Sequence, residues 1–483
     1  MKLFQRILSA DCDTPVSLFS RLRGEHDCFL FESAEGGEHW GRYSILGFDP
    51  AAIAIEKTGG LTVTNRNGKK QFSAETDVLS WIREHVIRHE KITLASGGSN
   101  TLPFTGGAVG YFSYDIIHRF EPGVEASITD DVIAAYMLID RFVVHDNLKG
   151  IVHLCVLESE QGAADLILDA IENTLATTPP PLPFHATAQE GLALEIPPSN
   201  VSQQEYEAMV EKSKEYILAG DIFQVVVSQR FSKTLDVEPL SIYRAVRHIN
   251  PSPYLFYMSI QDVTLIGSSP EILVRKEGNK AIVRPLAGTR PRGETAEADA
   301  VLEKELLADT KEIAEHVMLV DLGRNDLGRV SQFGTVKVTD SMSVERYSHV
   351  MHIVSQVEGT LRHDVDAIDL LAATFPAGTL SGAPKVRAMQ IIAELEGQHR
   401  GPYGGCIGYI SFGGEFMDTA IIIRTAVIEN GQLHVQAGAG LVADSVPTTE
   451  YQECVNKASA MFRAVALARA QKFEPQNNTT EEG

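Results

Sequence analysis

The sequence has few cysteines, only five in 483 residues, and none of them belongs to a C-x-x-C pair. An odd number at wide spacing excludes a regular disulfide framework and argues against a zinc site. Basic residues are also scarce, since 42 Lys and Arg face 64 Asp and Glu for a net charge of −22. Such a surface repels polyanions, so nucleic acid and anionic membranes are poor partners.

Long apolar runs are missing as well. The first residues contain no continuous apolar stretch and reach Asp11 and Asp13 early, which excludes a signal peptide. The apolar run 132–139 ends at Asp140 and is too short to span a bilayer. Together with the cysteine pattern, these features predict a cytoplasmic protein.

What the chain does contain is ample apolar material, 44% of its residues, which suits a globular core. One stretch breaks this composition, the proline-rich segment TTPPPLPFHATAQEGLALEIPPSN. Prolines there exclude an interior helix or a central strand. The chain is therefore divided into an N-terminal domain at 1–176, a linker at 177–200, a catalytic domain at 201–471 and a disordered tail at 472–483.

Strand-like runs cluster along the chain and do not alternate with single helices. This arrangement disfavours a doubly wound sheet and predicts an α+β sandwich flanked by helices. Ser202 and Glu205 form a capping-box pattern at the start of one predicted helix, and Gly220 suits the end of that helix. Longer elements are also predicted, including helices at 76–89 and 296–321 and one strand at 420–429.

Two pairs of carboxylates have helical spacing. Glu312 and Glu315 are three residues apart, Glu450 and Glu453 repeat the spacing, and Lys457 lies one turn beyond Glu453. Two solvated helix faces are the ordinary explanation of such pairs. Apolar residues continue both helices, however, and a carboxylate at the edge of a buried helix needs a cation. Carboxylates with open coordination positions suit Mg²⁺ that is shared with an anionic substrate.

Two glycine clusters, Gly378–Lys385 and Gly438–Gly440, precede predicted helices. Both can present backbone N–H groups to an anion, although a tight turn is the more common explanation of such a cluster taken alone. Neither cluster matches a Walker loop or a dinucleotide fingerprint.

Three single residues are also candidates for a site. Arg424 lies in an apolar run and calls for a carboxylate partner. His352 has apolar neighbours too, which more often indicates a core histidine than a base. Glu271 follows Pro270 and either caps a turn or projects into a site.

Taken together, these segments resemble the chorismate-utilising enzymes, most closely the large subunits of anthranilate synthase. The matching segments are FESAEGGEHWGRYSILG, FTGGAVGYFSYD, GDIFQVVVSQRF, NPSPYLFY, GSSPE, RPLAGTRPRG, EIAEHVMLVDLGRNDLGRV, YSHVMHIVS, GTLSGAPKVRAM, YGGCIGY, IIIRTAV, QAGAGLVADSVP and EYQECVNKA. They cover nearly the whole chain. The resemblance implies a two-layer β-sandwich of largely antiparallel sheets.

The resemblance also implies roles for individual residues. Glu315 and Glu453 would hold Mg²⁺, with Glu312 and Glu450 in the next shell or sharing that role. Glu271 would act as the acid, and His352, with Glu312 as its competitor, as the base. Substrate would contact Gly288, Thr289, Thr379, Tyr403, Arg424, Gly438, Ala439, Gly440 and Lys457.

Two positions point to one product within the family. Relatives that add water to chorismate carry a lysine where this chain has Gln224, and aminodeoxychorismate synthases often carry a lysine where it has Ala287. Both departures favour anthranilate as the product. Aminodeoxychorismate or isochorismate synthase remains the alternative, and a non-catalytic tryptophan-binding regulator is a third hypothesis.

Relatives of this type bind tryptophan as a feedback inhibitor. The matching residues are Glu32, Ser33, Asn250, Pro253, Tyr254 and Leu255. A rigid turn would also explain the prolines of NPSPY. No glutaminase motif is present, so we expect a separate amidotransferase subunit to supply ammonia from glutamine, while this chain alone uses free ammonia.

Overall fold

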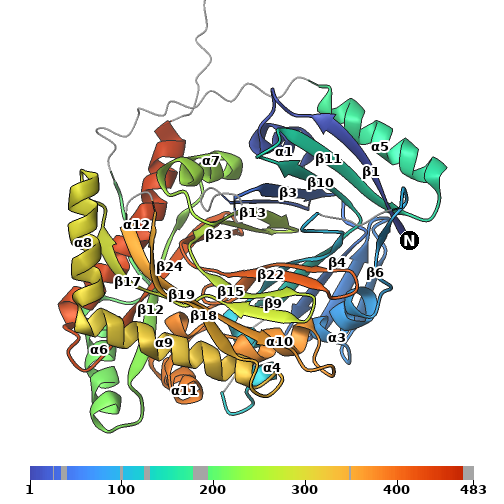
Figure 1. Ribbon diagram of the computed structural model, residues 1–483. Helices are drawn as coiled ribbons and strands as arrows, with labels where there is room; N and C mark the ends of the chain where they lie inside the picture. The colour runs from blue at the N-terminus through green and yellow to red at the C-terminus, as the bar shows by residue number, and fades with distance from the viewer. Residues whose placement is uncertain are drawn as a thin grey trace, which may run out of the picture.

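The computed structural model describes residues 1–24, 27–33, 41–97, 102–124, 131–177, 194–347 and 350–470. Its described residues form two large sheets that face each other, with helices on their outer sides (Figure 1). This confirms the predicted α+β sandwich. No helix in these ranges is long and apolar enough to cross a membrane.

The first sheet is antiparallel except where β1 meets β7. Its strand order is β20 (Gly382–Ala383), β12 (Gln224–Thr234), β24 (Gln432–Leu441), β23 (Thr425–Glu429), β14 (Val263–Ser269), β13 (Tyr254–Ile260), β2 (Cys28–Glu32), β3 (Tyr43–Phe48), β10 (Arg141–Asp146), β11 (Ile151–Glu158), β1 (Lys2–Ser9) and β7 (Thr93–Leu94).

The second sheet is antiparallel throughout. Its order is β17 (Leu286–Pro291), β19 (Val350–Thr360), β16 (Lys280–Val283), β15 (Ile272–Glu277), β22 (Phe416–Ile421), β21 (Cys406–Ser411), β8 (Gly107–Phe112), β9 (Val132–Ile139), β4 (Ala52–Lys57), β5 (Gly60–Asn65) and β6 (Lys70–Ser73), with β18 (Lys337–Arg346) paired to β19.

Each sheet has its own set of helices. Those that pack on the first sheet are α1 (Pro15–Leu22), α5 (Gln161–Leu175), α6 (Gln203–Leu218), α7 (Pro239–Ile249), α11 (Lys385–Glu396) and α12 (Pro447–Ala470). The second sheet carries α3 (Val78–Ile82), α8 (Ala296–Ala308), α9 (Thr310–Gly328) and α10 (Ala367–Thr374). Short turns of helix complete the described elements at η1 (Arg83–Ile87), η2 (Tyr114–Ile116), α4 (Ile117–Phe120) and η3 (Gly378–Leu380).

Both sheets cross from the N-terminal to the C-terminal part of the chain. In the first sheet β2 pairs with β13, from Glu32 opposite Leu255 to Cys28 opposite Ser259. In the second sheet β8 pairs with β21, where Gly110 lies opposite Gly408. A side chain at Gly408 would come within 2.0 Å of the Asp418 carbonyl oxygen. These two pairings, called the strand junctions below, join the parts that the sequence analysis separated.

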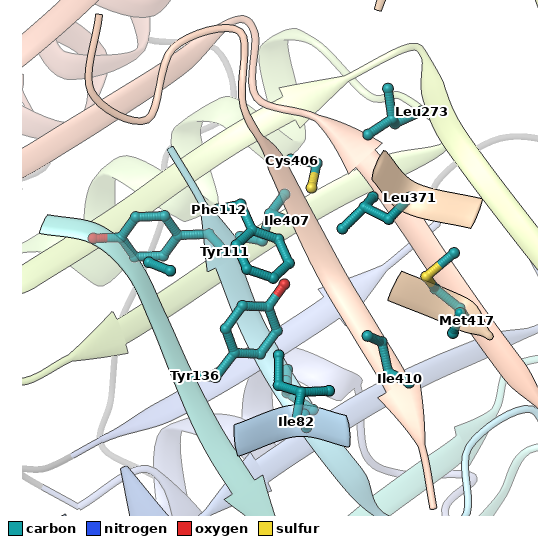
Figure 2. Packing of buried hydrophobic residues seen from close by; sticks show 14 of the residues in the cluster. Ile82, Tyr111, Phe112, Tyr136, Leu273, Leu371, Cys406, Ile407, Ile410 and Met417 are labelled. Carbon is teal, nitrogen blue, oxygen red and sulfur yellow. The ribbon is translucent and has the colours of Figure 1, made fainter. Parts of the chain in front are cut away.

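Around the second junction, side chains alternate between the two faces of the sheet. Phe112 and Tyr136 lie on one face with ring centroids 4.7 Å apart, among residues that pack toward Ile82 of α3 and Leu371 of α10 (Figure 2). Tyr111 points to the opposite face, toward the first sheet (Figure 2). The sheet is therefore buried on both sides where the two parts of the chain meet.

Three predicted elements were wrong in their extent. The single helix expected at 296–321 is two helices, because Asp309 ends α8 and its carboxylate accepts N–H groups of the first turn of α9. The strand expected at 420–429 is β22 and β23, which belong to different sheets. The helix expected at 76–89 is the short α3 followed by the π-helical turn η1.

Other local predictions were confirmed. The capping box of Ser202 and Glu205 starts α6, and Gly220 follows the end of α6 with a φ of 85°. Residues 178–193 of the predicted linker and the predicted tail at 472–483 lie outside the described residues. The domain boundaries remain a prediction.

We expect residues 194–470 expressed alone to aggregate or to lack a cooperative thermal melt, because β13 and β21 would become open edges next to an apolar core. Co-expression with residues 1–177 should restore soluble protein and a cooperative melt. A monomeric, cooperatively melting 194–470 fragment would contradict the interdependence of the two parts.

Candidate active site

Four carboxylates from two helices meet at one end of the sandwich. Glu312 and Glu315 lie on α9, while Glu450 and Glu453 lie on α12. Burial raises the pKa of Glu315, and the neighbouring charges of Glu312 and Glu453 raise it further. The pKa of Glu450 is raised by burial and then by Glu453. The two helices thus bring together negative charges that disfavour one another.

The floor beneath these carboxylates is the glycine-rich end of β24. The Gln224 amide hydrogen-bonds to Glu315, and a side chain at Gly440 would come within 2.7 Å of the Gln224 amide nitrogen. The Lys457 ammonium is 2.7 Å from Glu453 Oε1 and donates to the Gly438 carbonyl at 2.9 Å. Both acidic helices are therefore tied to this strand.

Tyr403 covers the same strand from the other side. It is buried, and a side chain at Gly438 would approach its hydroxyl oxygen to 2.8 Å. The backbone of Gly438 also hydrogen-bonds to Tyr403. Glycine at this position lets the backbone lie against the ring, and the same close packing would let a ligand approach the backbone.

β17 brings Gly288 next to the acidic helices. Gly288 has a φ of 76°, and a side chain there would lie 3.3 Å from Glu312 Oε2. Arg290 on the same strand forms an ion pair with Glu312 Oε1 at 3.2 Å. Ala287 is buried beside them and pairs with Ile353 of β19.

His352 on β19 is buried and neutral. Its Nδ1 is 3.1 Å from the Gly288 carbonyl oxygen and 3.0 Å from Thr289 Oγ1. Because a carbonyl only accepts, Nδ1 carries the proton and Nε2 has a free lone pair. No described group hydrogen-bonds to that Nε2. Burial lowers the pKa of His352 to about 4. The charge of the nearby Arg424 also lowers this pKa, whereas the hydrogen bond with Gly288 acts to raise it.

Glu271 lies in the turn between β14 and β15 with 8% of its surface exposed. Burial raises its pKa to about 8, although Thr379 and Arg424 both act to lower it. Thr379 Oγ1, on the turn η3, donates to Glu271 Oε1 at 3.0 Å. Glu271 is thus a carboxylic acid that stays protonated at neutral pH.

Arg424 faces Glu271 from the turn between β22 and β23, where its φ is 50°. Burial lowers the pKa of Arg424, and Glu271 is the nearest group that counteracts this. Within the described ranges, its guanidinium makes no hydrogen bond or ion pair. The carboxylate partner that the sequence suggested is therefore not found among the described residues, which leaves a half-buried positive charge for an anionic ligand.

These contacts connect all the residues that the sequence analysis assigned to catalysis, substrate and metal. The charge of Arg424 acts on both Glu271 and His352, His352 contacts Gly288, and Gly288 borders Glu312. Gln224 and Lys457 then join the acidic helices to Gly438–Gly440. The arrangement offers an acid, a neutral base, a buried cation and a carboxylate cluster.

The carboxylates fit a cation that takes only part of its shell from protein. Among the described residues, no three His, Cys, Asp or Glu side chains are placed to hold a metal alone. The charge of Glu453 is close enough to raise the pKa of Glu315. Mg²⁺ commonly binds through one or two carboxylates together with waters and substrate oxygens.

Apart from the candidate active site, a cavity of about 280 Å³ lies between the two sheets, next to both strand junctions. Five of the six residues assigned to tryptophan line it, namely Glu32, Ser33, Pro253, Tyr254 and Leu255. Asn250 is not among the lining residues; it ends α7, and its carbonyl accepts the Ser268 hydroxyl at 2.5 Å.

Sequence analysis missed the polar residues opposite these. Arg275 on β15 and Asp418 on β22 form an ion pair at 2.5 Å, and Tyr254 donates to Asp418 at 3.1 Å. Tyr409 also lines the cavity. The one available signal was a charge in each of two apolar strand patterns. Near the active site, Tyr347 was missed too; its ring centroid lies 5.5 Å from that of His352.

Comparison with known proteins gives consistent matches over most of the chain. A family model described as chorismate binding enzyme matches residues 27–463. Anthranilate synthase component 1 of Pseudomonas aeruginosa is 47% identical over 95% of this chain and 94% of that protein. The protein of the same name from Aquifex aeolicus is 46% identical over 97% and 95%.

Solved structures agree with these relatives. Anthranilate synthase component I from Streptococcus pneumoniae has a TM-score of 0.76 at 37% identity, covering 95% of this chain and 99% of that one. A menaquinone-specific isochorismate synthase from Escherichia coli has a TM-score of 0.69 at 20% identity, over 96% and 94%, and so shares the fold.

The buried acid gives a prediction that needs no substrate. The infrared spectrum at pH 7 should contain a protonated-carboxyl band that is absent in Glu271→Gln and disappears as pH rises through about 8. In Thr379→Val the band should persist to higher pH, because the lost hydrogen bond stabilised the ionised form. Identical spectra for the wild type and Glu271→Gln at pH 7 would mean that Glu271 is ionised.

Proposed function

The chain belongs to the chorismate binding enzymes, and from this premise we propose that it is an anthranilate synthase large subunit, which converts chorismate and ammonia to anthranilate and pyruvate, the first step of tryptophan biosynthesis. The observation that carries the proposal is the buried Glu271, hydrogen-bonded to Thr379, in the neighbourhood of an Arg424 that makes no ion pair with a described residue. Together they supply the acid and the positive charge that a dianion with a poor leaving group needs.

Substrate binding depends on positive charge held inside an acidic protein. Chorismate carries two carboxylates, and Arg424 and Lys457 are the cations that would bind them; the Lys457 ammonium donates to the Gly438 carbonyl. Gly288, Thr289, Thr379 and Tyr403 would shape the pocket, with backbone groups of Gly438–Gly440 beneath the ring. A buried arginine binds a carboxylate strongly because little water competes for it.

In the first step ammonia forms a bond to C2, the ring double bonds shift, and the C4 hydroxyl leaves as water. A hydroxide is a poor leaving group, so an acid must give it a proton. Glu271 fits this role because burial keeps its proton in place up to a pH of about 8.

In the second step the C2 proton is removed, the bond between ring C3 and the ether oxygen breaks, and the ring becomes aromatic. The leaving enolpyruvate takes up a proton to become pyruvate. His352 presents an unprotonated Nε2 and stays neutral because burial lowers its pKa to about 4. Glu312 is the competing base, but its carboxylate is already paired with Arg290.

Glu315 and Glu453 would hold Mg²⁺, with Glu312 and Glu450 beside them. A carboxylate has two oxygens, so Glu453 can bind Lys457 and a metal together. When bound, Mg²⁺ would polarise the ring carboxylate of the substrate and stabilise negative charge that develops on it. The raised pKa values of Glu315 and Glu450 support a cation here, since a cation would relieve the mutual repulsion.

Two residues favour anthranilate over the products of sister enzymes. Gln224 lies at the position of the lysine base that activates water, and its amide contacts Glu315 instead. Ala287 is buried against β19 and offers no nucleophile. Ammonia needs no base before it attacks, so neither lysine is required.

The cavity between the sheets would bind tryptophan as a feedback inhibitor. Phe31, Tyr254 and Tyr409 supply aromatic walls for an indole, while Glu32 and Ser33 could bind the amino-acid end. Glu32 is already held by Tyr243 and Arg247 of α7, so its carboxylate is fixed in place.

The source of ammonia would be a second subunit that hydrolyses glutamine, as the name component 1 of the relatives suggests. This chain alone would work with free ammonia. The cytoplasmic location predicted from the sequence remains a prediction.

The decisive assay combines purified chain, chorismate, Mg²⁺ and ammonium at a pH of about 8, where free ammonia is present and part of the Glu271 carboxyls still hold their proton. We expect fluorescent anthranilate with one pyruvate per turnover, no activity with glutamine alone, and inhibition by tryptophan. A 4-amino or hydroxylated product without pyruvate would identify a sister activity. Absence of any turnover, with tryptophan binding retained, would favour a regulator.

We expect Glu315→Gln to reduce turnover by at least about 100-fold, because a neutral amide is a poor Mg²⁺ ligand. Asp321→Asn on the exposed face of the same helix serves as the matched control and should retain wild-type turnover. Wild-type turnover and Mg²⁺ dependence in Glu315→Gln would place the metal elsewhere.

A further inference from the structure

Arg400 is a fully buried arginine that no catalytic step uses. Only 1% of its side chain and 4% of that of Glu396 are exposed, and the two form a two-pronged ion pair. Arg400 Nε is 2.8 Å from Glu396 Oε2, and Nη2 is 2.7 Å from Oε1. A buried pair of this kind is weak evidence for stability, because desolvation offsets the attraction.

The remaining N–H groups of Arg400 bind two backbone carbonyls that belong to the active-site framework. Nη1 donates to the Leu380 carbonyl at 2.7 Å, at the end of the turn η3 that carries Thr379. Nη2 donates to the Val226 carbonyl at 2.7 Å. Val226 lies directly opposite Gly440 in the β12–β24 ladder. One guanidinium therefore links the turn that carries Thr379 to β12, the strand that pairs with Gly438–Gly440 of β24.

The flat faces of the same guanidinium pack on two tyrosines. Its central carbon lies 4.6 Å from the Tyr114 ring centroid and 5.7 Å from that of Tyr403. Tyr403 in turn contacts Gly438. Glu396 completes the arrangement, because it accepts the backbone N–H and the hydroxyl of Ser228, opposite Gly438, at 2.7 and 2.8 Å.

We propose that Arg400 is a positioning residue that fixes the distances between Thr379, Tyr403 and Gly438–Gly440, and through Thr379 orients Glu271. It touches no substrate. Only a planar fork with several donors can bind a carboxylate and two carbonyls while stacking on rings, so lysine is not an equivalent. The proposal rests on the function proposed above, because its consequences are read in that reaction.

Arg400→Lys keeps the charge beside Glu396 but loses the fork. We expect kcat/KM for chorismate to fall about 10-fold to 100-fold, as for a displacement of about 1 Å in a catalytic group. The Thr379 hydrogen bond to Glu271 should weaken, which moves the alkaline limb of the kcat/KM profile to higher pH. Thr379→Val should produce the same shift directly. A loss of stability alone would not move this limb.

Arg21→Lys is the matched control. Arg21 has 7% side-chain exposure, pairs with Asp13 and donates to the Leu175 carbonyl at 2.6 Å, in the distant α1–α5 region. It should keep wild-type kcat/KM and the wild-type pH limb even if its melting temperature falls.

A folded Arg400→Lys with wild-type kcat/KM and an unmoved alkaline limb would overturn the proposal, and so would a loss of activity without the shift. If Arg400→Lys lacks a cooperative melt, Tyr114→Leu carries the test, since it leaves the ion pair and removes one stacking face. A smaller shift in the same direction supports the proposal, and no shift overturns it. If the wild type makes no anthranilate, the proposed function fails, while the infrared titration of Glu271 in these variants still decides the role of Arg400.

Discussion

The rest of the structure depends on two backbone pairings, β2 with β13 and β8 with β21. Each one continues a sheet from the first part of the chain into the second, so neither part has a complete sheet of its own. In the second pairing Gly110 lies opposite Gly408, and a side chain at either position would clash with the next strand, β9 beside Gly110 and β22 beside Gly408. The cavity assigned to tryptophan lies beside these pairings. The candidate active-site residues all come from the second part of the chain. Any ligand that moves one sheet against the other would act through the same strands.

Charge is the second constraint. The chain has a net charge of −22, yet its candidate substrate is a dianion. The structure concentrates the opposing charge by burial. Arg424 makes no ion pair within the described residues, and burial raises the pKa of the nearby Glu271 to about 8. The carboxylates of α9 and α12 show the reverse arrangement, in which negative charges are placed together and fit a cation. Burial thus shifts the pKa values of Glu271 and Arg424 on one side and of Glu315 on the other, away from the values of exposed groups.

The sequence predicted the parts of the fold whose signals are local. The capping box at Ser202 and Glu205 started α6, and the clustered strands gave the α+β sandwich. Prediction failed where tertiary contacts decide. The sequence has a local helix-start signal at Asp309, which Glu312 follows three residues later, but the helical pattern runs on through it. Only the structure shows that Asp309 caps α9 and pairs with Arg290 of β17. Likewise, the run around Arg424 looks like one strand, and only the two-sheet arrangement splits it.

By itself, the sequence determined the family and its candidate residues, because motif order and residue type survive without coordinates. It named Glu271, His352 and Arg424, but it left each with an ordinary explanation beside the functional one. Only the tertiary structure supplies their burial and their neighbours distant in sequence, on which protonation and free hydrogen-bonding capacity depend, and their roles in the reaction remain a proposal. The same reason explains why Arg400, Arg275 and Asp418 escaped notice: each is an unremarkable charge until the fold buries it beside a partner.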